Sequence, residues 1–147
     1  MTLPWMQWAE LSNSPEFLMT ERTTTAQHRH NLELSKLRSA WETIAISQFN
    51  GRIWNIGGSV QTASGYIRDF RIDVPEAYPY QAPRAYAVGW NPGTMHTYEN
   101  NELCLWRQEQ WSPRYTLAYA VAKTFTWIHK HDVYIYTYRW PGKGQAH

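Results

Sequence analysis

The apolar positions of the chain follow a helical period first and a strand period afterwards. Over Thr25–Ser39 and just beyond, leucine and tryptophan recur at spacings of three and four, at Leu34, Leu37 and Trp41, with no glycine or proline between them. This spacing predicts an amphipathic helix. Residues 1–20 show no such period but are rich in tryptophan, leucine and phenylalanine, so we expect an irregular arm that docks on the body of the protein.

Four short segments with strand character follow, at residues 43–49, 52–62, 66–74 and 84–88. In the third, Phe70, Ile72 and Val74 alternate with polar residues, which predicts one buried face. Asn50-Gly51 is a strong hairpin-turn signal, and 63–65 is a plausible hairpin loop. Gly57-Gly58 indicates a bulge or an early turn. The short connections predict an antiparallel meander.

The connection between the third and fourth segments holds three prolines in nine residues, Pro75, Pro79 and Pro83. Proline lacks the N–H that strand pairing needs, so we expect a rigid, extended crossover here. The Tyr78-Pro79 bond is a candidate for the cis form. Residues 89–115 have no clear period, and their aromatic content favours an ordered, functional loop over a disordered one.

A second helix is signalled from Ser112, a candidate N-cap with Pro113 in the first turn; Thr116 is the alternative cap. Its apolar stripe consists of Leu117, Val121, Phe125 and Ile128. Residues 139–144, Arg-Trp-Pro-Gly-Lys-Gly, end any continuing helix. The whole order predicts a single α+β domain over residues 1–147, with helices covering a four-stranded antiparallel sheet.

Composition and charge exclude several classes of function. The net charge is only +2 and the basic residues are dispersed, so we expect no nucleic-acid partner. No run approaches the ~18 uncharged apolar residues of a membrane helix, and the N-terminus does not resemble a secretory signal. A single cysteine excludes an internal disulfide and a multi-cysteine zinc site, and it suits a reducing cytoplasm. We expect no cofactor.

That cysteine, Cys104, lies in Glu102-Leu103-Cys104-Leu105-Trp106, and Trp111-Ser112-Pro113 begins seven residues after it. A lone thiol with a polar loop before it and a Trp-Ser-Pro turn after it is a candidate nucleophile. The simpler interpretation of an isolated cysteine is a small buried hydrophobic residue.

Three motifs, in this order, resemble the ubiquitin-conjugating enzyme family. They are Asp73-Val74-Pro75 with Tyr78-Pro79 and Pro83, then Leu103-Cys104-Leu105, and then Trp111-Ser112-Pro113 with Thr116. Each motif alone is weak, but the ordered set covers roughly residues 25–131. The resemblance implies the family's fold, a four-stranded meander flanked by helices, here with a shortened C-terminus.

The chain departs from the family's pattern before the cysteine. The usual His-Pro-Asn tripeptide is absent, and His96 stands where the family places its asparagine, eight residues before Cys104. The C-terminus also leaves no room for the family's two last helices. A bacterial branch of the family is resembled in three features: His96, Cys104-Leu105-Trp106, and the tail Trp140-Pro141-Gly142. That branch occurs in antiphage defence operons, some built around a nucleotidyltransferase resembling the cyclic-dinucleotide synthases.

The resemblance implies that Cys104 carries an acyl group as a thioester and passes it to an amine, chemistry that suits a sulfur nucleophile. The acyl group would come from a ubiquitin-like modifier or from the C-terminal glycine of a partner nucleotidyltransferase. Because the chain has no Gly-rich nucleotide loop, a separate activating enzyme or an already activated donor is required. His96 would donate to the oxyanion, lower the thiol pKa or accept a proton from the amine, or it would only brace the loop.

The remaining motifs have structural interpretations. Trp106 and Trp111 are expected to wall the cysteine and pack beneath it, and Ser112 and Pro113 to shape the turn into the helix. The pairs His28/His30 and His129/His131 are expected to be exposed and not to bind metal, because residues two apart do not share a helix face.

A different class of function is a catalytically silent binding module that scaffolds a partner protein through its aromatic faces. The nine tryptophans and ten tyrosines are compatible with it. The retained Cys104 in a matching setting favours the enzyme. A carbohydrate-stacking β-sandwich would need more strands than the pattern provides.

Overall fold

The computed structural model describes residues 3–22 and 25–142. Along the chain these residues form α1 (Pro4–Ser12), the 3₁₀ turn η1 (Pro15–Phe17), α2 (Ala26–Ala40), β1 (Ala45–Phe49), β2 (Arg52–Gln61), β3 (Ile67–Asp73), β4 (Arg84–Val88), η2 (Glu99–Asn101), β5 (Glu102–Leu103), η3 (Gln108–Gln110) and α3 (Leu117–Thr137). The predicted first helix and the four predicted strands are therefore present, close to their expected bounds.

The strands form one antiparallel sheet in the order β1-β2-β3-β4-β5. Asn50 and Gly51 both have positive φ, 52° and 68°, as a tight hairpin turn of this handedness requires. The expected irregularity at Gly57-Gly58 is wrong, because both pair in register with β3. A Cβ at Gly58 would lie 2.9 Å from the Phe70 ring, so glycine leaves room for that side chain.

The sheet has five strands, where the sequence predicted four. The fifth, β5, is two residues long and pairs with β4 through Ala85–Leu103 and Tyr86–Glu102. Two residues are too few to show alternation, so only the pairing with β4 reveals this strand. It places Cys104 directly after the last pair of the sheet.

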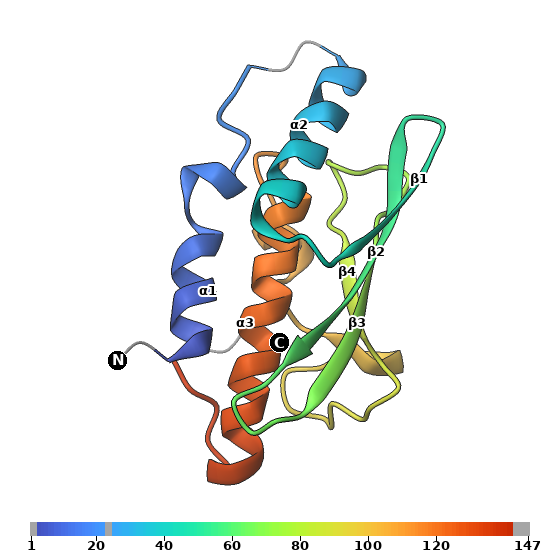
Figure 1. The fold of residues 1–147 in the computed structure, drawn as a ribbon. Helices are drawn as coiled ribbons and strands as arrows, with labels where there is room; N and C mark the ends of the chain where they lie inside the picture. The colour runs from blue at the N-terminus through green and yellow to red at the C-terminus, as the bar shows by residue number, and fades with distance from the viewer. Residues whose placement is uncertain (1–2, 23–24, 143–147) are drawn as a thin grey trace.

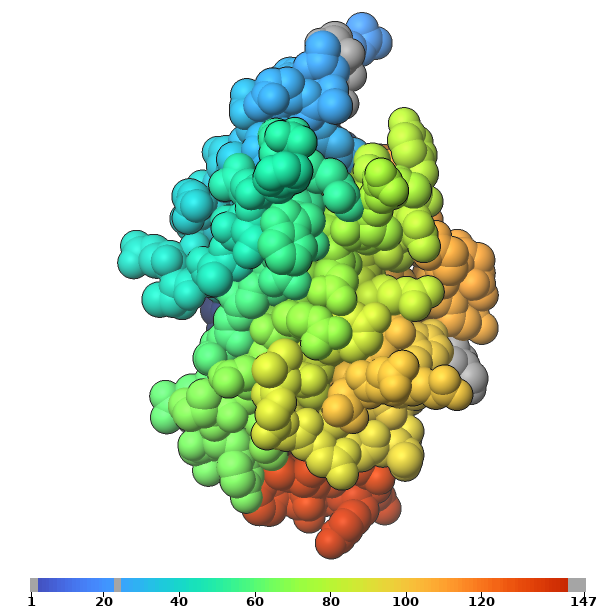
Figure 2. Space-filling model, turned by 90° about the vertical axis from the view of Figure 1, so that its right-hand side faces the viewer, coloured from blue at the N-terminus to red at the C-terminus, as the bar shows by residue number. Residues whose placement is uncertain are grey.

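The elements are arranged in layers, with α3 between the sheet and α1 and with α2 beside it (Figure 1). The apolar face of the sheet and the stripe of α3 form the core, which includes the fully or almost fully buried Leu37, Ile56, Phe70, Ile72, Val121 and Ile128. The opposite face of the sheet carries cross-strand polar pairs such as Asn55–Asp73 (2.9 Å). Figure 2 views this side, with the orange segment that follows Cys104 at its edge.

The N-terminal arm docks on the body as expected, but it is helical and not irregular. Trp8 stacks on Trp41 at 5.7 Å and meets the edge of Phe125 at 5.0 Å, which fastens α1 against α3. A helix of nine residues is marginal on its own, so this packing is what stabilises it. The helical conformation of α1 therefore depends on packing against the rest of the protein, and the apolar spacing of residues 1–20 did not predict it.

The long helix α3 begins at Leu117, because Thr116 is the N-cap and its hydroxyl accepts from the Tyr119 N–H (3.1 Å). The expectation that Ser112 caps the helix is therefore wrong, and Thr116, the alternative, is confirmed. The helix ends at Thr137, and its C-cap Tyr138 has a left-handed backbone (φ 59°). Lys143 and Gly144 of the predicted helix break lie outside the described residues. None of the described helices is long and apolar enough to cross a membrane.

The expectation that His129 and His131 are exposed is also wrong, since they are 8% and 5% exposed. Helix α3 packs between the sheet and α1, with α2 beside it (Figure 1), and several of its polar side chains are buried with it. His28 is exposed, as expected.

Candidate functional site

Residues 96–104 form a small hairpin that brings Cys104 beside residues distant from it along the loop. The Cys104 N–H donates to the His96 carbonyl at 2.9 Å, and the Tyr98 N–H donates to the Glu102 carbonyl at 2.8 Å. Thr97 and Leu103 pair between these bonds. The turn uses left-handed Asn100 and Asn101 (φ 61° and 63°), a conformation that asparagine tolerates better than most residues. This pairing orders residues 96–104, which are part of the loop of residues 89–115 that was predicted to be ordered.

The Cys104 thiol is buried, with 2% of the residue exposed. Burial raises the thiol pKa, and the nearby Glu102 carboxylate raises it further; the hydroxyl of Tyr98, which hydrogen-bonds with the sulfur, and the charge of Arg107 act in the opposite direction. At neutral pH the sulfur is therefore held mainly as the thiol, with a donor already in place for the thiolate.

Tyr98 is a candidate site residue that the sequence did not indicate. Its hydroxyl donates to the Trp106 carbonyl at 3.4 Å and also hydrogen-bonds with the Cys104 sulfur. Burial, with the neighbouring sulfur, raises the pKa of this phenol to about 12, so it remains a proton donor over the physiological range. The available signal was its place two residues after His96, on the same face of a hairpin as Cys104, but the hairpin itself was not predicted.

His96 lies next to Cys104 through the main chain. Its carbonyl accepts from both the Cys104 N–H and the Trp127 indole N–H, each at 2.9 Å. Its backbone is left-handed (φ 56°), and its ring packs on Trp140 with the centroids 4.6 Å apart. The structure thus brings the two predicted catalytic residues together. The role of the imidazole stays a prediction.

Trp106 and Trp111 pack on each other at 4.9 Å, and Trp106 also stacks on Tyr119 at 5.9 Å. The Trp111 indole donates to the Pro79 carbonyl at 2.7 Å, which ties this pair to the proline-rich crossover. The Tyr78-Pro79 bond within that crossover is cis, as anticipated. That the two tryptophans wall the thiol stays a prediction; what is established is that they form one aromatic layer joined to Tyr98 through the Trp106 carbonyl.

Ser112 and Pro113 shape the turn before α3 and do not begin the helix. The Ser112 carbonyl accepts from the Tyr115 N–H at 2.9 Å, and its hydroxyl accepts from the Arg114 N–H at 3.2 Å. The Pro113 carbonyl accepts from the Arg29 guanidinium at 2.7 Å. The turn is therefore fastened to α2.

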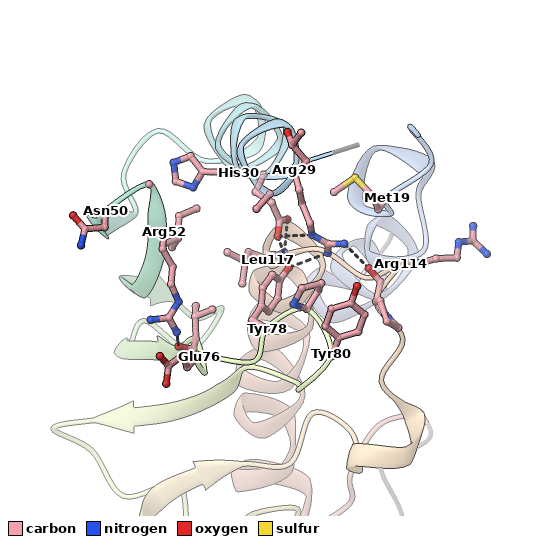
Figure 3. Close-up of a pocket in the computed structure, with 18 residues that line it drawn as sticks. Met19, Arg29, His30, Asn50, Arg52, Glu76, Tyr78, Tyr80, Arg114 and Leu117 are labelled. Atoms are coloured by element: carbon pink, nitrogen blue, oxygen red, sulfur yellow. Dashed lines mark hydrogen bonds and ion pairs between the residues drawn. The ribbon is translucent and has the colours of Figure 1, made fainter. Parts of the chain in front are cut away.

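A buried polar cluster, the Glu33 centre, consists of Glu33 with Arg29 and Tyr78, the last two of which are labelled in Figure 3. The Glu33 carboxylate, 2% exposed as a residue, accepts from the Leu117 N–H at 3.0 Å and from the Tyr78 hydroxyl, and Arg29 lies 3.6 Å from it. Burial raises the pKa of both Glu33 and Tyr78. The centre joins α2, the crossover and the start of α3. The sequence signal was a glutamate four residues before Leu37, on the buried stripe of the helix.

A pocket of about 980 Å³ opens beside the Glu33 centre. Met19, Ile53, Leu117 and Tyr80 supply apolar walls, and Arg52 and Arg114 lie at its sides (Figure 3). Neither Cys104 nor His96 lines it. The pocket is nevertheless linked to the cysteine region, because Pro79 lines it and accepts the Trp111 hydrogen bond.

His131, one of the two buried histidines of α3, is part of an aromatic stack. His131 stacks on Trp127 at 5.2 Å with the rings 13° apart. Burial lowers the pKa of His129 and of His131. Within residues 3–22 and 25–142, no group of three or more His, Cys, Asp or Glu side chains is arranged to hold a metal ion.

The fold is that of a ubiquitin-conjugating enzyme. A crystal structure of ubiquitin conjugating enzyme E2 from Plasmodium falciparum superposes with a TM-score of 0.52 at 19% sequence identity, covering 69% of this chain and 96% of that one. No protein-family model and no curated protein matches the sequence. At this identity the likeness concerns the fold alone, an α+β arrangement of an antiparallel sheet and helices, and it agrees with the fold that the three sequence motifs implied.

Proposed function

We propose that the protein is an acyl carrier of the ubiquitin-conjugating type, with Cys104 as the nucleophile. The observation that carries the proposal is the hairpin of residues 96–104, which sets the cysteine opposite His96 and against the Tyr98 hydroxyl in a fold of this type. The acyl group would be a ubiquitin-like modifier or the C-terminal glycine of a nucleotidyltransferase. The setting would be bacterial antiviral defence in the cytoplasm.

The chemistry needs two transfers. In the first, the Cys104 thiolate attacks the carbonyl of an activated donor, such as a thioester on an activating enzyme, and the donor's thiol leaves with a proton. In the second, an amine attacks the Cys104 thioester, the C–S bond breaks, and the sulfur regains a proton while an amide forms. The oxyanion that forms when the amine attacks the thioester needs a nearby donor. Tyr98 and His96 are the side chains that this hairpin offers.

Burial of the thiol sets a condition on this cycle. Since Cys104 is 2% exposed, loading requires the groups that cover the sulfur to move aside. Once the acyl group is attached, the same enclosed surroundings slow hydrolysis of the thioester by water.

The same burial is the observation that favours the second candidate, a binding module that scaffolds a partner protein. In that case Cys104 is a packing residue, and the pocket beside the Glu33 centre, with its apolar walls and flanking arginines, is the surface that a partner segment would occupy. The two candidates differ in whether any covalent adduct depends on the sulfur.

Incubation with candidate donors, followed by non-reducing electrophoresis and mass spectrometry, separates the two. The acyl carrier predicts an adduct on wild-type protein that a thiol reductant removes, a reductant-resistant ester on Cys104→Ser, and no adduct on Cys104→Ala. The same adducts on wild type and Cys104→Ala would rule out the carrier. Unchanged partner binding by Cys104→Ala, without any adduct on wild type, would favour the module.

A further inference from the structure

The segment that follows α3 returns to the cysteine region. After the left-handed Tyr138, Arg139 is held by Thr137, whose hydroxyl accepts from the Arg139 N–H and contacts the Arg139 carbonyl, each at 3.1 Å. This turn directs Trp140 back onto the structure. Its ring lies 4.6 Å from the His96 ring, 5.2 Å from Trp127 and 6.1 Å from Tyr134, measured between centroids.

Two tryptophans thus hold His96 in different ways. Trp127 holds the main chain, since its indole N–H donates to the His96 carbonyl that also accepts from Cys104. Trp140 contacts the imidazole itself, with the two ring planes inclined by 48°. The backbone of His96 is left-handed (φ 56°), a conformation that a non-glycine residue keeps only where its surroundings enforce it.

The returning segment is anchored on its far side by α1. Gly142 (φ 65°) passes so close to Trp5 that an added Cβ would lie 3.0 Å from the indole. Lys130 of α3 lies over the same indole, 5.0 Å from its centroid. Trp140 therefore lies between Gly142, which packs against Trp5, and the end of α3. With both ends of this segment held, Trp140 can restrict the orientation of the His96 ring.

We propose that Trp140 is a positioning residue for aminolysis: it orients the His96 imidazole toward the thioester on Cys104, so the C-terminal segment completes the site. This inference rests on the proposed function. Loading needs the thiolate and an activated donor, whereas the transfer to an amine depends on the placement of the groups that meet the attacking nitrogen. Misplacement of such a group costs up to ~100-fold in rate. Loss of Trp140 therefore slows the second transfer and spares the first.

The test measures loading and single-turnover discharge to free lysine for Trp140→Ala and Trp140→Phe, across pH. We expect Trp140→Ala to load like wild type and to discharge about tenfold more slowly, with a flattened pH profile. Trp140→Phe should restore most of the rate. In a His96→Ala background, Trp140→Ala should add no further loss, because both changes act through one ring. A wild-type discharge rate in Trp140→Ala, or a full additional loss in the double variant, overturns the proposal.

Two controls keep failures distinguishable. Trp54, 49% exposed on β2, is a matched tryptophan away from this contact, and Trp54→Ala should leave discharge unchanged. Trp140→Leu, which keeps apolar volume without a ring, replaces Trp140→Ala if that variant does not fold. Trp140→Ala and Trp140→Leu should each show the slow discharge.

The imidazole C–H resonances of His96, assigned by their loss in His96→Ala, report the contact without any donor. Trp140→Ala should shift them by removing a ring current; unshifted resonances overturn the contact. If they shift but wild type forms no adduct on Cys104, the proposed function fails and the role of Trp140 in aminolysis fails with it. If wild type discharges and Trp140→Ala does so equally, only the positioning proposal fails.

Discussion

The Glu33 centre and the hairpin of residues 96–104 both bury titratable groups beside the start or the flank of α3, yet they are built on opposite principles. In the centre, one carboxylate meets a backbone N–H, a phenol and a guanidinium from three elements. In the hairpin, one thiol meets a phenol of the same hairpin, and the left-handed His96, Asn100 and Asn101 lie within nine residues.

The difference separates stability from reactivity. A buried carboxylate with several partners strongly resists removal, because its loss leaves charges and donors unpaired in the interior. A buried thiol is small and nearly apolar, so it can be exposed or replaced at lower cost. Strained backbone of the kind seen in the hairpin is tolerated where surrounding structure enforces it, and such conformations cluster at functional sites.

Removal of Glu33 should produce the largest effect of those predicted below. Glu33→Ala strands the Leu117 N–H, the Tyr78 hydroxyl and the Arg29 guanidinium, and we expect it to lower the free energy of unfolding by about 3–5 kcal/mol. Urea denaturation measures this. The exposed Glu42→Ala is the matched control and should change stability by less than ~0.5 kcal/mol. A Glu33→Ala protein as stable as the control would contradict the structural role of the centre.

Removal of the Tyr98 hydroxyl should act on reactivity instead. A hydrogen bond to a charged group contributes about 1.5–3 kcal/mol, so Tyr98→Phe should reduce the thiolate fraction of Cys104 roughly tenfold near neutral pH. Because this hydroxyl opposes the rise in the thiol pKa, its loss moves the rate–pH profile of iodoacetamide alkylation to higher pH. Tyr86→Phe, on the sheet, serves as control. An unchanged or downward-shifted profile for Tyr98→Phe would show that the hydroxyl does not stabilise the thiolate.

A change of pH should produce the smallest effect of the three. It should change the free energy of unfolding with one sign through His131, near the hairpin, and with the opposite sign through Glu33. Burial, assisted by Arg68, lowers the pKa of His131, and the Pro92 carbonyl and Asp132 only partly oppose it. A histidine with a depressed folded-state pKa contributes stability that is present above about pH 6.5 and is lost as the pH falls below it. His131 stacks on Trp127, and the Trp127 indole donates to the His96 carbonyl of the hairpin. Protonation of His131 is therefore expected to destabilise the packing next to the hairpin.

The raised pKa of Glu33 acts in the other direction, because its contribution is present in acid and is lost as the pH rises. The free energy of unfolding of His131→Gln, compared with wild type at pH 7.5 and 5.5, isolates the histidine. We expect a weaker fall in acid for His131→Gln and an unaltered fall for the exposed His28→Gln. If the free energy of unfolding fell equally in wild type, His131→Gln and His28→Gln, His131 would not be the source of the acid sensitivity.

The fold could be predicted to a large extent because its signals are local. The spacing of Leu34, Leu37 and Trp41 predicted α2, and Asn50-Gly51 predicted the first hairpin turn, since each depends on neighbours within a few residues. The N-terminal helix and β5 were missed because packing on α3 and pairing with β4 decide them.

The sequence singled out Cys104 because its segment resembles the family motif, and His96 because it lies eight residues before that cysteine; their catalytic roles stay predictions. It did not single out Tyr98 or Trp140 as site residues. Tyr98 meets the sulfur only because the hairpin forms, and Trp140 meets His96 only because the chain reverses after α3. Both contacts depend on backbone turns at left-handed residues other than glycine, which carry little sequence signal.

The sequence by itself therefore determined the class of the fold, the order of its main elements and the one cysteine proposed as nucleophile, because periodicity, turn residues and a lone cysteine are properties of short segments. Only the tertiary structure decided that the thiol is buried, which hydroxyl lies beside it, and that the C-terminal segment rests on His96. These are contacts between residues up to 44 positions apart, and such contacts exist only after the layers of the protein have packed.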